Sequence, residues 1–363
     1  MKRTIISILL VIMTMTSMAQ IKPEVSETVE FMAILSRTAG FQEYCMDMGG
    51  SYTKDTEEWF APHKEHPTVS YYQALRAKYG ISHDAVMTMA INIAAENGAI
   101  KMLTDKSALG NRWKNVDVDT FMVLLTQFYT DTKFHDFFVQ HQAFYEEGCQ
   151  LYEDNVMPYF NQSWYPKFYG TQPTNRFCVI IGFTNGGGNY GPKRLLPDQP
   201  EEIFAIAGYY VNPQTGKVFE NGLDYASTLI HEFNHSFVNP LLDDESNILL
   251  LQRIGQGLMK LSNYSMSRQN YNSWQTIYNE SIVRAAVIIY MMENGFDNQY
   301  LQRELFEQVV RDFRWMPELI TALRIYMGNR NQYTTLNDFY PQIALTLDEY
   351  LKKEQERILK PLQ

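Results

Sequence analysis

The chain of 363 residues has only three cysteines, Cys45, Cys149 and Cys178. None of them stands at the spacing of a metal-binding pair, and their odd number permits one disulfide and a free thiol, or three buried thiols. A dense disulfide framework is therefore excluded, and a hydrophobic core must stabilise the fold. With 45% hydrophobic residues, a chain of this length can form one large domain or two of moderate size.

Positively charged residues are also fewer than negatively charged ones. The chain contains 31 lysines and arginines against 41 aspartates and glutamates, which gives a net charge of -10. No run of basic residues is present. Because proteins neutralise the phosphates of nucleic acid with clustered lysine and arginine, nucleic acid is not an expected partner.

The hydrophobic run at the N-terminus is too short to span a membrane. It covers residues 5–13, between Lys2-Arg3 and the small-x-small sequence Ser17-Met18-Ala19. This order is typical of a cleavable signal peptide. We therefore expect residues 1–19 to be removed by cleavage after Ala19. The mature protein is then periplasmic or secreted, with no integral membrane segment.

A phosphate-binding loop is missing as well. Residues 185–189 (Asn-Gly-Gly-Gly-Asn) follow residues 177–183, a short apolar run that predicts a buried strand. The glycines lack both the G-x-G-x-x-G pattern before a helix and a following Gly-Lys-Ser/Thr. We interpret this segment as a flexible loop between strands.

What the sequence does contain is the pentapeptide His231-Glu232-Phe233-Asn234-His235, which has the pattern H-E-x-x-H. On a helix, residues four apart lie on one face, so the two imidazoles can bind the same metal ion. Glu232 then lies close enough to act on a water molecule at that ion. Two neutral nitrogen ligands, a carboxylate base and an open coordination position are what a zinc peptidase needs. The alternative is a helix with two surface histidines.

The residues around this motif predict a helix of about four turns. Asn221-Gly222 precedes it as a turn, Asp224 suits the helix N-terminus, and Pro240 ends the hydrogen-bond ladder. Apolar residues recur at helical spacing and predict the buried face: Ala226, Ile230, Phe233 and Phe237. The two histidines lie beside this face and not within it.

A catalytic zinc site needs a third protein ligand. A longer motif with a glycine and a third histidine is excluded, because Val238 and Leu241 stand at those positions. The best candidate is Glu280, 45 residues after His235, in an otherwise apolar helical stretch. An ionised carboxylate there needs a partner to offset its desolvation, and Arg284 lies one helical turn away.

Two alternatives to this ligand stay open. Glu280 and Arg284 can instead form an ion pair on the surface of a helix. The acidic run Asp243, Asp244 and Glu245 follows the first motif closely and can supply the third ligand, although a polar run of this kind is usually solvated.

Hydrolysis of a peptide bond also needs a donor for the oxyanion that develops in the transition state. Tyr264, Tyr271, Tyr278 and Arg284 lie in the right part of the chain. We choose Tyr264, in a polar segment expected to be a loop, and Arg284 as catalytic residues in addition to Glu232.

The rest of the pattern is mostly helical. Helices are expected over residues 25–39, 71–79, 83–97, 118–128 and 134–160, and again over residues 248–261, 271–293, 300–313, 317–327 and 338–360. A second strand is expected over residues 202–211, then a turn and a short return strand at residues 217–219.

The two motifs together resemble a known group of enzymes. The pattern His231-Glu232-x-x-His235, followed by Glu280-x-x-x-Arg284, resembles the gluzincin branch of zinc metallopeptidases. The resemblance implies one Zn2+ ion held by His231, His235 and Glu280, with Glu232 as the general base. It also implies a peptide or protein substrate.

The whole chain is also similar to an uncharacterised family of exported bacterial proteins that carry this motif. The similarity is carried by residues 59–67, 80–87 and 222–240. In the zincin arrangement, the strand beside the metal helix is an edge strand that pairs with extended peptide. We therefore expect residues 204–210 to form such an edge, with an ordinary internal strand as the alternative.

These patterns predict an α+β fold. A zincin-like metallopeptidase domain, with a small mixed sheet and many helices, is expected over residues 166–363, after a helical N-terminal region over residues 20–165. The expected function is that of an exported zinc-dependent metallopeptidase. The alternatives are a catalytically inactive zincin-like protein that binds peptide or glycan, and a zinc hydrolase with a non-peptide substrate.

Overall fold

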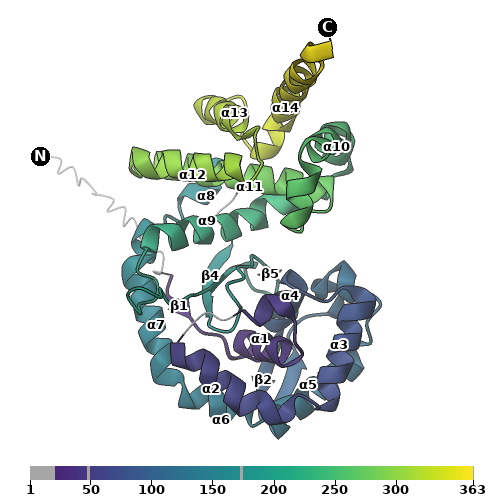
Figure 1. Ribbon diagram of the computed structural model, residues 1–363, viewed down its shortest axis with the longest axis vertical. Helices are drawn as coiled ribbons and strands as arrows, with labels where there is room; N and C mark the ends of the chain where they lie inside the picture. The colour runs from purple at the N-terminus through teal and green to yellow at the C-terminus, as the bar shows by residue number, and fades with distance from the viewer. Residues whose placement is uncertain (1–20, 47–49, 172–174, 363) are drawn as a thin grey trace, which may run out of the picture.

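The computed structural model describes residues 21–46, 50–171 and 175–362. The expected signal peptide, residues 1–19, lies outside the described residues. Within them the protein has the expected α+β fold, with fourteen α-helices, a four-stranded sheet and a separate two-stranded hairpin (Figure 1). None of the described helices is both long and apolar enough to cross a membrane.

The first helix, α1 (Glu27–Thr38), lies at the centre of the N-terminal half of the fold (Figure 1). It begins at Ser26, whose hydroxyl accepts a hydrogen bond from the Val29 amide, and residues 28–36 are all buried. The other helices of this half are α2 (Gly50–Phe60), α3 (Pro67–Tyr79), α4 (Asp84–Ile91), α5 (Val118–Asp131), α6 (Phe134–Gln140), α7 (Gln142–Asn155) and α8 (Trp164–Tyr169). Helices therefore dominate this half, as the sequence predicts.

The helix expected over residues 83–97 is only half present. Helix α4 ends at Ile91, and the chain continues into a hairpin of β2 (Ile93–Glu96) and β3 (Ala99–Met102). The two turn residues, Asn97 and Gly98, have φ angles of 52° and 78°. Asn-Gly is a favoured pair for such a tight hairpin turn, because both residues tolerate positive φ. This dipeptide was the available signal for the hairpin.

The single helix expected over residues 134–160 is also wrong. The structure has α6 and α7, separated at His141, and a 3-10 turn at Met157–Tyr159. His141 has φ -99° and ψ 8°, and its Nδ1 lies 2.8 Å from the Phe137 carbonyl oxygen. A side chain that hydrogen-bonds to a carbonyl of the preceding helical turn in this way competes with the helical ladder and favours a break.

The main sheet has the strand order β1-β4-β6-β5. Its long strands, β4 (Arg176–Gly182) and β6 (Glu202–Gly208), are parallel to each other and almost fully buried, which is typical of parallel strands. The short strand β1 (Pro23–Glu24) adds to β4 in parallel, and β5 (Lys193–Arg194) adds to β6 in antiparallel.

The expectation that residues 204–210 form an edge strand is wrong. Strand β6 is internal, because β5 and the bridge between Tyr190 and Ile206 cover the side that faces away from β4. The short return strand expected at residues 217–219 is absent too, and the described chain forms only a turn there, closed by the Asn212 amide on the Lys217 carbonyl. Pairing across a sheet depends on distant segments, which local periodicity does not report.

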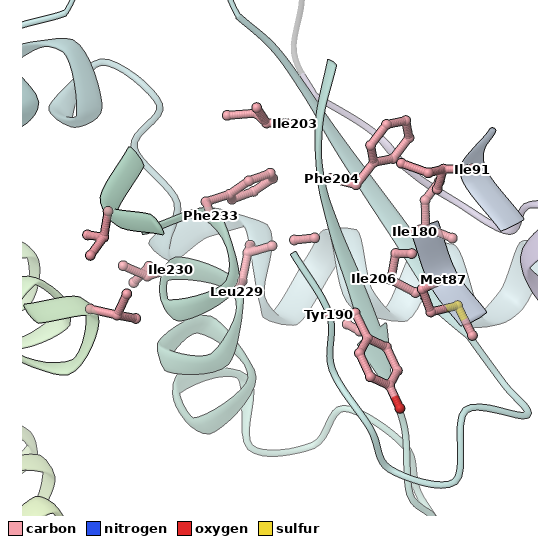
Figure 2. Packing of buried hydrophobic residues seen from close by; sticks show 14 of the residues in the cluster. Met87, Ile91, Ile180, Tyr190, Ile203, Phe204, Ile206, Leu229, Ile230 and Phe233 are labelled. Atoms are coloured by element: carbon pink, nitrogen blue, oxygen red, sulfur yellow. The ribbon is translucent and has the colours of Figure 1, made fainter. Parts of the chain in front are cut away.

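The sheet is packed between two helices (Figure 2). Leu229 and Phe233 of α9 (Gly222–Val238) point toward one face of the sheet, whereas Met87 and Ile91 of α4 lie against the other. All four side chains are buried. The helix that carries the H-E-x-x-H motif is therefore fixed on one side by the sheet.

The C-terminal helices lie on the far side of α9 (Figure 1). They are α10 (Glu245–Arg268), α11 (Trp274–Glu293), α12 (Asn298–Val310), α13 (Met316–Gly328) and α14 (Leu336–Leu359), close to the helices expected from the sequence. Helix α11 packs against α9, α10 and α13 and is buried along most of its length. A rigid pair of helices, α9 and α11, thus forms the centre of this half of the molecule.

Glu30 of α1 has a fully buried carboxyl group that joins the N-terminal helices to the end of β4. It accepts hydrogen bonds from the Phe183 amide at 2.6 Å, the Tyr52 hydroxyl at 2.8 Å and the Thr184 hydroxyl at 2.9 Å. Burial raises the pKa of Glu30 from 4.5 to about 7, although these hydrogen bonds oppose the rise. Ionisation of Glu30 therefore destabilises the folded state.

This pKa predicts a pH-dependent stability that Glu30→Gln removes. Because the folded-state pKa is raised, the contribution of Glu30 is fully present below about pH 4.5 and is lost as pH rises through about 7. Between pH 5 and pH 8, the free energy of unfolding of the unmodified protein should fall by about 2 to 3 kcal/mol relative to Glu30→Gln. Urea denaturation of both proteins at each pH measures this difference. Equal pH profiles would show that Glu30 titrates normally.

Candidate metal centre

The two motif histidines lie one turn apart on α9, with their Nε2 atoms 3.1 Å from each other. Between them, Phe233 and Asn234 are fully buried. The Asn234 amide donates to the Val283 carbonyl of α11 and accepts from the Tyr169 hydroxyl. These contacts fix the rotation of α9 about its axis. As a result, His231 and His235 face α11 and remain partly exposed to solvent.

Glu280 of α11 completes a group of three ligand-type side chains. Its Oε2 lies 3.6 Å from His231 Nε2, and its Oε1 lies 3.4 Å from His235 Nε2. Tetrahedral ligands with bonds of about 2.0 to 2.1 Å stand about 3.3 Å from one another. The spacing of the three side chains therefore fits a single metal ion, and the group could hold one.

Hydrogen bonds with Asn239 and Arg284 orient the side chains of His235 and Glu280. His235 Nδ1 lies 3.2 Å from the Asn239 side-chain oxygen, which leaves Nε2 free for a metal. Arg284 donates to Glu280 Oε2 from Nε at 3.0 Å and from Nη2 at 2.9 Å. Both members of this ion pair are buried, at 7% and 8% exposure. The surface ion pair considered from the sequence is thus a buried one, and it supports the Glu280 carboxylate.

The acidic run after α9 takes no part in this group. Asp244 caps α10, where its carboxylate accepts from the Ser246 amide at 2.9 Å. Asp243 and Glu245 are exposed. Among the described residues, the one cluster of metal-ligating side chains is formed by His231, His235 and Glu280.

Burial and neighbouring charges set the pKa values of the site. Burial raises the pKa of Glu232 to about 7. Burial also opposes ionisation of Glu280, but the Arg284 guanidinium and the two imidazoles outweigh it and hold the pKa of Glu280 well below its usual range. Burial lowers the pKa of His231, whereas for His235 the bond with Glu280 outweighs burial and raises the pKa to about 9. Glu280 is thus ionised, and Glu232 can exchange a proton near neutral pH.

The sequence pattern of one protein family matches residues 12–345. This family is described as a domain of unknown function, DUF4932. The chain belongs to this family. No curated protein and no solved structure matches the chain. The DUF4932 match spans both the N-terminal helices and the H-E-x-x-H helix, so the two halves of the fold belong to one family unit.

A cleft of about 1060 Å³ runs past the metal-ligating side chains of this DUF4932 protein. One wall is formed by α4 and the segment Asn189 to Pro192, and the other by α12 and the turn before α11. Glu232 lines the cleft together with the three ligand-type residues. The base and the candidate ligands therefore face the same space.

Helix α12 is held at this cleft by polar contacts. Its one buried residue is Gln308, whose side-chain oxygen accepts from Arg284 Nη1 at 2.9 Å and whose amide donates to Glu304 at 2.6 Å. Glu304 in turn accepts from Ser227 of α9 at 3.1 Å. A network of hydrogen bonds thus links α12 to Glu280 through Arg284.

The position expected for Tyr264 is wrong. Helix α10 continues to Arg268, because no glycine or proline interrupts residues 262–268, and Tyr264 is a 77% exposed residue on its surface and does not line the cleft. Tyr271, and not Tyr264, lies in the cleft beside the candidate metal ligands. Asn270, with φ 66°, turns the chain after α10, and Tyr271 then lines the cleft with its hydroxyl 2.9 Å from Arg284 Nη2. An asparagine after the helix was the signal for this turn.

Proposed function

We propose that this DUF4932 protein is an exported zinc-dependent peptidase of the gluzincin type. The observation that carries the proposal is the convergence of His231, His235 and Glu280 beside the buried carboxyl of Glu232, in one open cleft. Two imidazoles and one carboxylate are a donor set that suits catalytic zinc. A site with only a structural role has no need of a buried carboxyl group beside the ligands that can act as a base.

In the proposed reaction, His231, His235 and Glu280 would hold a zinc ion, which would supply polarisation of the scissile carbonyl and a lowered pKa of water. Glu232 takes a proton from the attacking water and passes it to the leaving amine. Burial raises the pKa of Glu232, which makes its carboxylate a stronger base for the first of these steps. Arg284 keeps the Glu280 carboxylate ionised and oriented.

The segment from Tyr190 to Pro192, which lies beside α9, supplies the proposed binding edge for an extended peptide. Tyr190 and Pro192 direct their backbone groups to β6, where they bond to Ile206 and Phe204. Gly191 lies between them, so its backbone groups point the other way. A Cβ atom on Gly191 would lie 2.3 Å from the Glu232 carbonyl oxygen, so this edge is packed directly on the metal helix. The proposed peptide-binding edge is thus this segment, in place of β6.

Tyr271 is the proposed oxyanion donor, and Tyr264 provides a matched control. Tyr271→Phe should lower kcat by about 10- to 1000-fold with little change in zinc content, because it removes one hydroxyl at the cleft. Tyr264→Phe removes an equivalent hydroxyl from an exposed helix surface and should leave kcat unchanged. Steady-state kinetics on a cleaved peptide compare the two. Equal activity of both variants would remove Tyr271 from the catalytic set.

Metal analysis combined with a peptide library tests the function itself. The purified protein should contain about one zinc per chain, cleave members of the library, lose activity with a chelator and regain it with zinc. Zinc without hydrolysis would indicate a binding protein for peptide or glycan. Hydrolysis confined to non-peptide esters or amides would indicate a different zinc hydrolase. Absence of zinc binding would contradict the proposal.

A further inference from the structure

His83 has a backbone conformation that is unusual for a residue with a side chain. Its φ is 50° and its ψ is -122°, and the Ala85 amide donates to the Ser82 carbonyl at 3.1 Å. These values place His83 at the second position of a type II′ turn, which normally requires glycine. A histidine in this conformation is strained. The strain lowers the free energy of unfolding, and the surrounding contacts must offset it.

Contacts from the turn between α1 and α2, supported by α3, hold this strained residue in place. The Tyr44 hydroxyl donates to the His83 carbonyl at 3.0 Å. The Glu43 carboxylate accepts from the His83 amide at 3.4 Å and lies 3.6 Å from the imidazole Nδ1. Arg76 donates to Glu43 at 2.9 Å and fixes the carboxylate. Backbone and ring of His83 are therefore both positioned.

The imidazole held in this way faces the cleft that contains the metal-ligating residues. Its side chain is 45% exposed and lines that cleft on the wall formed by α4. Because Nδ1 faces Glu43, the other nitrogen, Nε2, is directed away, and it has no hydrogen-bond partner among the described residues. Tyr44 also stacks on Tyr190, with ring centroids 6.3 Å apart, and the next residue, Gly191, lies against the Glu232 carbonyl of the metal helix.

We infer that His83 is a substrate-binding residue, which contacts a polar group of the bound peptide through Nε2 from the wall opposite α12. This inference rests on the proposed peptidase function. It gives the N-terminal helices a direct part in substrate recognition. It also explains why a strained histidine stands where glycine would relieve the strain, because glycine would remove the contact.

The variants His83→Gly and His83→Ala separate this role from a structural one. Both remove the imidazole, so kcat/KM should fall about tenfold in each, mainly through KM. Only glycine relieves the backbone strain, so His83→Gly should melt at a higher temperature than His83→Ala. His83→Asn keeps a polar group that tolerates positive φ and should recover part of the activity. His135→Ala, on an exposed histidine outside the cleft, is the control and should match the unmodified protein.

Kinetics on several library peptides that the unmodified protein cleaves, together with thermal melts and zinc content, distinguish the outcomes. A uniform loss over all peptides indicates contact with the substrate backbone, and a loss confined to particular residues indicates contact with a side chain; both support the inference. Activity of His83→Gly within twofold of the unmodified protein overturns it, as does activity that follows melting temperature across the variants. If the unmodified protein cleaves no peptide, the proposed function fails, and this inference fails with it.

Discussion

Glu280→Gln is expected to abolish stable zinc binding and to lower the free energy of unfolding of the metal-free protein by about 3 kcal/mol. The loss of zinc follows because the third ligand loses its charge, and affinity should fall by more than about 100-fold. The loss of stability follows because Arg284, at 8% exposure, is left without its counter-ion. Removal of one member of a buried ion pair typically costs about 3 to 5 kcal/mol. Denaturation curves and metal analysis measure the two effects separately.

Two further variants control this experiment. Glu58 and Lys54 form an ion pair with the same i,i+4 spacing on α2, but both are exposed, so Glu58→Gln should change the free energy of unfolding by less than about 0.5 kcal/mol. The double variant Glu280→Gln with Arg284→Met should recover most of the stability but no zinc binding, because no buried charge remains unpaired. If Glu280→Gln keeps zinc at normal affinity, Glu280 is not a ligand.

Glu232→Gln is expected to lower kcat by about 10²- to 10⁴-fold while the zinc content stays unchanged. Glutamine has nearly the same shape as glutamate but cannot take a proton from water, so the loss should be in kcat with little change in KM. Glu245→Gln is the matched control, because Glu245 is an exposed carboxylate on the first turn of α10 and should have no effect. Full activity of Glu232→Gln would exclude the mechanism, and loss of zinc in that variant would mean a structural role instead.

Part of this candidate site was predictable because it depends on local spacing. His231 and His235 are separated by one helical turn, so their sequence positions alone place both imidazoles on one face. Glu280 was predictable for a different reason, because a carboxylate within an apolar helix must be compensated, and Arg284 follows at i,i+4. The distance between Glu280 and the histidines was not predictable, since it depends on how α9 packs against α11.

The other features of the cleft depend on longer-range structure. Tyr271 faces the cleft only because α10 runs on to Arg268 and the chain turns at Asn270, and an error of a few residues in the helix end led to Tyr264 instead. His83 lies in one of the stretches that carry the family similarity, but its proposed role follows from a backbone angle, which the sequence pattern does not report. The proposed peptide-binding edge at Gly191 depends on the pairing of β5 with β6, which a strand pattern in β6 cannot report.

The pairing of β1 with β4 joins two segments that are far apart in the chain. Pro23 pairs with Val179, so the first described strand reaches its partner only after the intervening helices have been synthesised. Such non-local pairing slows folding, and until it forms, the edge of β4 stays open to association with other chains. The segment that follows the expected cleavage site at Ala19 thus protects the sheet beside the metal helix from aggregation.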